Sequence, residues 1–124
     1  MPVLETKGAI SAQGFGLTLQ QGEVNYIEDV FNTWVYTGTG ANLTINNGLD
    51  LAGKGGLVWN KSRSNSYSHS LIDTVRGAGI PIFSNAISAQ QTSGYTNSLT
   101  GFTSTGFTLG SDSQGLVNNN GFTY

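Results

Sequence analysis

Residues 55–61 have the sequence Gly-Gly-Leu-Val-Trp-Asn-Lys, in which two glycines lead into a short alternating run. In an extended chain, Leu57, Trp59 and the stem of Lys61 lie on one face. Residues 62–68, which follow, are polar apart from Tyr67 and are expected to form a loop. A run of this kind, between glycines and a polar loop, predicts a short β-strand.

The same pattern recurs on both sides of this stretch. Residues 30–36 are the richest in aromatic and β-branched side chains, so they have the strongest strand propensity of the chain. Residues 43–45 form a shorter strand that ends at Asn46-Asn47-Gly48, a sequence typical of a tight turn. Further strands are predicted over residues 69–76, 80–83, 99–102, 106–109 and 122–124. Many short strands separated by glycine and asparagine turns predict an all-β, antiparallel sandwich of the jelly-roll kind.

The first 25 residues differ from the rest because they are rich in glycine and small side chains. We expect residues 1–25 to form an extended N-terminal docking arm, ordered against a partner, and residues 26–124 to form the β-sandwich-like module. The chain stops at Thr123 and Tyr124, on residues typical of the opening of a strand. We therefore expect an incomplete sandwich that is the N-terminal part of a longer protein.

Charged residues make up only 10% of the chain, and the net charge is −2. An average soluble domain has roughly 25% charged residues, so this surface is neutral and polar. Five scattered lysines and arginines offer no basic patch, which argues against nucleic acid as a partner. The chain has no cysteine and shows neither a signal peptide nor an apolar run of membrane-spanning length. We expect a product that is made in the cytosol and is not inserted into a membrane.

Residues suited to catalysis or metal binding are few. His69 is the only histidine, and its neighbour Ser70 would lie on the opposite face of a strand, out of reach of the imidazole even with Asp73 close by. The carboxylates are dispersed, and Asp112 between two serines is a thin candidate for a calcium loop. The sequence therefore predicts a protein that is not an enzyme, with no catalytic residues, no metal site and no cofactor.

Two sets of residues are candidates for other roles. Asp73 and Arg76 are close enough to pair with each other or to bind backbone amides at the turn around Gly77, and a structural role is favoured over a ligand-binding one. The aromatic residues could stack on a sugar ring. For Trp34 and Trp59 a place in the core is favoured over a sugar platform, whereas for Tyr67, in a polar loop, the two are evenly balanced. Candidate glycan contacts are Trp59, Tyr67 and His69.

Several strings occur in the order typical of one family. They are residues 55–63 (Gly-Gly-Leu-Val-Trp-Asn-Lys-Ser-Arg), residues 69–77 (His-Ser-Leu-Ile-Asp-Thr-Val-Arg-Gly), residues 106–111 and residues 117–124. Over residues 29–124 the chain resembles the concanavalin A-like, laminin-G-like β module of tail-fibre and other virion-associated proteins of tailed bacteriophages. In that family a further apolar strand follows the position of Tyr124. The resemblance carries over no catalytic residue.

The resemblance implies a structural component of a phage virion, located in the tail and made in the host cytoplasm. The leading hypothesis is a tail-fibre or tail-associated subunit that docks on other virion proteins through its N-terminal region, as a homo-oligomer in which a trimer is favoured. Two alternatives stay open, a module that binds host-surface glycans and a head decoration protein. An enzyme ranks fourth.

Overall fold

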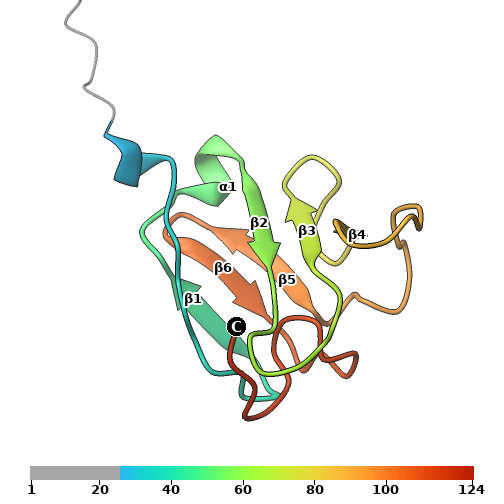
Figure 1. The fold of residues 1–124 in the computed structure, drawn as a ribbon. Helices are drawn as coiled ribbons and strands as arrows, with labels where there is room; N and C mark the ends of the chain where they lie inside the picture. The colour runs from blue at the N-terminus through green and yellow to red at the C-terminus, as the bar shows by residue number, and fades with distance from the viewer. Residues whose placement is uncertain (1–25) are drawn as a thin grey trace, which may run out of the picture.

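A computed structural model describes residues 26–124 (Figure 1). The predicted arm, residues 1–25, lies outside the described residues. The elements follow one another as η2 (Ile27–Asp29), β1 (Leu43–Asn46), α1 (Leu51–Lys54), β2 (Leu57–Asn60), β3 (Ser70–Asp73), β4 (Ile82–Phe83), β5 (Leu99–Thr103) and β6 (Gly106–Leu109). No helix in this part of the chain is long and apolar enough to cross a membrane.

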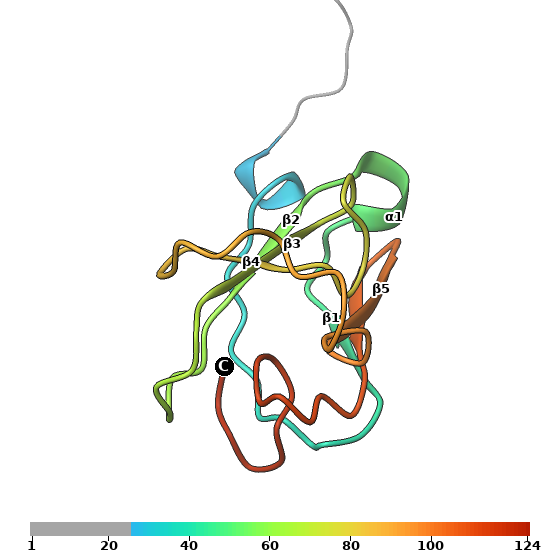
Figure 2. The same cartoon turned by 90° about the vertical axis from the view of Figure 1, so that its right-hand side faces the viewer.

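The strands form two antiparallel three-stranded sheets, ordered β1-β6-β5 and β2-β3-β4. Both sheets contribute side chains to one core, with Ile45, Phe107 and Leu109 from the first and Val58 and Ile72 from the second. Figure 2 shows the two sheets as separate layers. The predicted all-β, antiparallel fold is therefore confirmed.

Most of the predicted strands are present, with small changes at their ends. Strand β6 has the predicted bounds, and β1, β2 and β5 differ by one residue at the C-terminal end. The predicted strand over 69–76 is shorter, because residues 74–76 turn away after Asp73. Pro81 lies directly before β4, an edge strand, in agreement with its missing amide hydrogen.

The predicted strand over residues 30–36 is wrong. This segment is extended but joins no sheet, and Val30, Trp34 and Val35 are exposed. Only the end of the segment is paired, through an isolated antiparallel bridge between Thr37 and Thr123. The strand predicted over residues 122–124 is likewise reduced to this bridge. The propensity of these residues is real, but a strand needs a neighbour along its length, and here only the last residues have one.

Candidate functional site

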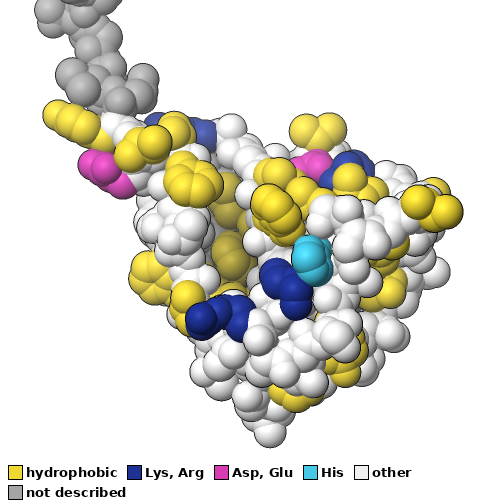
Figure 3. Space-filling model, in the orientation of Figure 1, with side chains coloured by type: hydrophobic (Ala, Val, Ile, Leu, Met, Phe, Trp, Pro, Cys, Tyr) yellow, Lys and Arg dark blue, Asp and Glu magenta, His cyan; other side chains and the backbone are white. Residues whose placement is uncertain are grey.

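A groove of about 740 Å³ opens between the extended residues 30–36 and strand β2. Its floor is largely apolar and includes Leu51, Val58 and Phe107, which belong to the core. In the space-filling view a hollow with apolar atoms in its depth lies on the face turned to the reader (Figure 3). Such an apolar hollow on a neutral surface is a concave feature that a partner could occupy.

The rim of the groove carries exposed apolar side chains. We call Phe31, Val35, Leu57 and Trp59 the apolar rim, because all four line the groove and are exposed, Trp59 by 66%. Single exposed apolar residues are ordinary, whereas several around one groove are typical of an interaction surface.

The prediction that Trp34 and Trp59 lie in the core is wrong. Trp59 is in β2, whose alternation buries Val58 and Asn60 and turns Leu57 and Trp59 outward. Trp34 is 49% exposed at the groove, where no strand among residues 26–124 lies beside it. Both indoles are therefore accessible to a partner.

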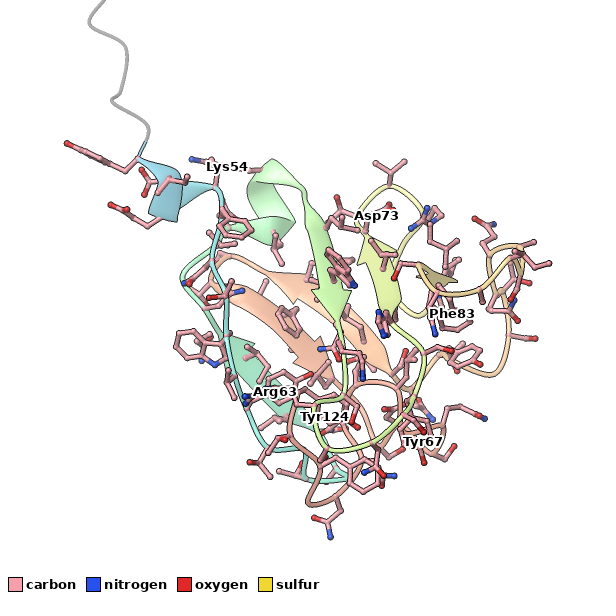
Figure 4. All side chains as sticks on the ribbon, in the orientation of Figure 1. Lys54, Arg63, Tyr67, Asp73, Phe83 and Tyr124 are labelled. Carbon is pink, nitrogen blue, oxygen red and sulfur yellow. The ribbon has the colours of Figure 1, made fainter. Side chains whose placement is uncertain are left out.

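The structure brings two of the three candidate glycan residues to one face. Trp59 is opposite Leu71 in the β2–β3 ladder, and His69 lies two residues before Leu71, so the alternation places Trp59 and His69 on the same outer face. Tyr67 lies elsewhere, near the C-terminal residues (Figure 4). Its ring stacks on that of Phe122 at 5.8 Å and fills the space that a side chain at Gly115 would need.

Ser70 and His69 lie on opposite faces, as the sequence predicted. Ser70 is completely buried, whereas His69 is half-buried, and its backbone amide donates to Asn85 Oδ1 at 2.9 Å. Asp112 is 2% exposed and accepts hydrogen bonds from two backbone amides. Among the described residues no group of three or more His, Cys, Asp or Glu side chains could hold a metal ion.

Asp73 and Arg76 form an ion pair of 2.6 Å. Asp73 Oδ1 also accepts hydrogen bonds from the amides of Val75 and Arg76, and Arg76 Nη2 donates to the carbonyl oxygen of Leu71. The ion pair and the binding of backbone amides, which the sequence offered as alternatives, are thus both present. They fix the turn that follows β3, which is a structural role.

Sequence reasoning missed a polar cluster at one end of the groove. The Tyr36 hydroxyl donates to the Val117 carbonyl at 2.7 Å and accepts from Asn60 Nδ2 at 2.7 Å, and its ring stacks on that of Tyr124. Asn60 Oδ1 is buried and has no partner among the described residues. An asparagine facing the core between Val58 and Ser62 gives no signal in composition or propensity.

Burial raises the pKa of Tyr36 and of Tyr124 above the usual 10.0. A raised pKa in the folded state means that the fold holds the neutral phenol, so this stability is fully present below pH 10 and is lost as the pH rises above it. We predict that the free energy of unfolding falls above pH 10, by up to about 1.4 kcal/mol per pH unit for Tyr36, with a smaller contribution from Tyr124. Urea titrations between pH 8 and 11.5 measure this slope, which must be shallower in Tyr36→Phe; equal slopes would contradict the prediction.

Comparison with known proteins places the chain in a family. Residues 27–124 match the model of the family described as domain of unknown function, DUF7483. Neither the curated proteins nor the solved structures include a match. Because the family model covers nearly all of the described residues, the chain belongs to the DUF7483 family.

Proposed function

We propose that the chain is a structural, non-enzymatic component of a tailed-bacteriophage virion. In this proposal it is a tail-fibre or tail-associated subunit that docks on other virion proteins through its N-terminal region. The phage context is supported by the resemblance of residues 55–63 and 69–77 to virion-associated β modules. The docking role is supported by the apolar rim.

The apolar rim is the observation that carries the docking proposal. Phe31 and Val35 belong to the N-terminal part of the described chain, and Leu57 and Trp59 belong to the neighbouring strand β2, so the surface is built where docking is proposed. Trp is among the residues that dominate the energy of protein interfaces, since its large ring loses little conformational entropy on binding. The low charge of the chain favours a partner surface that is also apolar and neutral.

Immunogold labelling of purified particles, with antiserum raised against this chain, tests the proposed location. The particles are those of the virus whose genome encodes the chain. Label on the tail or its fibres is the expected result. Label over the head would indicate a head-decoration protein instead of a tail subunit. Particles without label would overturn the virion proposal.

Substitution of Trp59 tests the docking surface. We predict that Trp59→Ala changes the free energy of unfolding by less than about 0.5 kcal/mol, since the ring is exposed, but weakens binding to purified tails at least about tenfold. Co-sedimentation with tails from a virus that lacks the gene measures the binding. Val75→Ala is the matched control, because Val75 is 93% exposed and does not line the groove. Equal binding by the two variants would exclude the rim as the docking surface.

Binding of a host-surface glycan is the second candidate function. It is favoured by the exposed Trp59 ring, which shares the outer face of the sheet with His69. Glycan-array binding that is lost in Trp59→Ala and kept in Tyr67→Phe would support it, because Tyr67 packs on Phe122 and not beside Trp59. An array without any bound glycan would remove this candidate.

A further inference from the structure

The outer face of the β2–β3 ladder brings an aromatic ring next to two nitrogen-bearing side chains. In this ladder Trp59 is opposite Leu71. Continuing the same register by two residues places Lys61 opposite His69, and the alternation turns both side chains to the face of Trp59. Side chains that are opposite each other in such a ladder have Cβ atoms about 5 Å apart. Trp59, Lys61 and His69 are therefore neighbours, and we call these three residues the outer cluster.

The ammonium group of Lys61 is held in place by the loop that follows β2. Its Nζ donates to the carbonyl oxygens of Ser62 and Asn65, and the side chain is half-buried. An ammonium group has three N–H donors, so one remains for a ligand. His69 is also half-buried and is tied by its backbone amide to Asn85 Oδ1 at 2.9 Å. An imidazole has at least one N–H donor in either protonation state, so both side chains can donate to the same ligand.

This end of the outer face is positive, although the chain as a whole has a net charge of −2. Among the described residues neither Lys61 nor Arg63 forms an ion pair with a carboxylate. Asp73 is on the same face, but at the other end of the ladder, where it pairs with Arg76. Figure 3 shows the histidine beside a Lys or Arg side chain, with Asp and Glu side chains near the top of the view. A ligand that complements this end of the face is an anion.

The exposed tryptophan indicates which class of anion fits. Trp59 is 66% exposed, and its indole offers a flat apolar surface on which a sugar ring can stack. The two donors, one from Lys61 and one from His69, match the two oxygens of a single carboxylate. Phosphate and sulfate are better matched by the planar fork of an arginine. Arg63 lies outside the ladder, near the chain end (Figure 4).

We propose that the outer cluster binds a hexuronic acid unit of a polysaccharide. The sugar ring stacks on Trp59, and the carboxylate lies between Lys61 and His69. The inference rests on the second candidate function, glycan binding, and names the class of glycan. Because these side chains stand perpendicular to the sheet, the site does not depend on which strand pairs with the other edge of β2.

Calorimetric titration of the complete 124-residue chain with short oligomers of galacturonic, glucuronic and mannuronic acid tests the proposal. The methyl esters of the same oligomers are the matched ligands, since they keep every ring and lose the negative charges. We expect at least one acid to bind at least about tenfold more tightly than its ester. A salt concentration of about 0.15 M screens distant charges, so the difference reports contacts at the site.

Substitutions assign the binding to the outer cluster. Trp59→Ala and Lys61→Gln are each expected to weaken binding of the acid at least about tenfold. Lys54→Gln is the matched control, because it removes the same charge from the exposed end of α1 and must bind as the parent chain does. His69→Gln is a second test that leaves the loop contacts of Lys61 intact, and it keeps the inference testable if Lys61→Gln fails to fold.

Three results would overturn the inference. Equal affinity for acid and ester would keep glycan binding as a function but exclude the carboxylate, and so would tighter binding of a sulfated oligomer of neutral sugars. Equal weakening by Lys61→Gln and Lys54→Gln would indicate general attraction between charges. A chain that binds none of the oligomers would exclude the site, whereas the proposed tail location is tested separately by labelling of the particles.

Discussion

Replacing Gly106 with alanine will destabilise the module by at least about 3 kcal/mol, the largest effect expected of any single methyl group in this fold. Gly106 begins β6 directly opposite Asn46 of β1. A Cβ at this position would overlap the carbonyl oxygen of Ile45 and would also meet the amide nitrogen of Asn47. These are backbone atoms, so no side chain can move aside, and β1 and β6 would have to separate. Because β6 is the middle strand of its sheet, the disruption extends to β5.

Urea denaturation followed by tryptophan fluorescence measures this loss. Gly48→Ala is the matched control: nothing lies within 4 Å of a Cβ there, and the cost is about 1 kcal/mol for the positive φ of 88° alone. A Gly106→Ala variant as stable as Gly48→Ala would show that the β1–β6 contact is looser than the structure has it.

Short strands between glycine turns could be predicted well from the sequence. At β6 the alternation of Phe107, Thr108 and Leu109 between two glycines predicts a short strand, and the structure contains this strand with the predicted bounds. Such segments have a partner close by in sequence, as β6 has in β5, so local pattern and tertiary pairing agree.

Residues 30–36 have the strongest strand propensity of the chain, yet the strand predicted there is wrong. The aromatic and β-branched side chains favour an extended chain, and the chain is extended there. The hydrogen-bond partner, however, is decided by residues far away in sequence, and residues 122–124 reach only as far as Tyr36. Propensity reports the fit of a side chain to a pleated surface and contains no information about whether the neighbouring strand is present.

The groove could not be predicted from the sequence for a related reason. The sequence of β2 shows the alternation of its two faces. Tryptophan is normally a better core residue than asparagine, so the sequence predicts that the face of Trp59 is buried. In the structure the buried face is that of Val58 and Asn60. What reverses the assignment is the bond between Asn60 Nδ2 and the hydroxyl of Tyr36, 24 residues away. A buried amide of this kind can be found only once its partner has been placed.

Asp112→Ala is expected to cost about 3 to 5 kcal/mol, because it removes an acceptor on which two buried amides depend. Asp112 is 2% exposed, and its Oδ2 accepts from the amides of Val117 at 2.6 Å and Asn118 at 2.8 Å. Both of those residues are completely buried, so no water replaces the lost carboxylate. Alanine also fits poorly at the positive φ of 41°, which aspartate and asparagine tolerate better.

The consequences reach the polar end of the groove. Asn118 Nδ2 donates to the carbonyls of Ala41 and Gly110, and Val117 accepts the hydroxyl of Tyr36, so loss of Asp112 loosens the residues that hold Tyr36 in place. Asp112→Asn is the matched control, since its amide oxygen can still accept a hydrogen bond and the same φ remains accessible; we expect it to cost about 1 kcal/mol. Thermal unfolding followed by circular dichroism ranks the three proteins. An alanine variant no less stable than the asparagine variant would show that the amides of Val117 and Asn118 find other acceptors, and that the carboxylate has a different role.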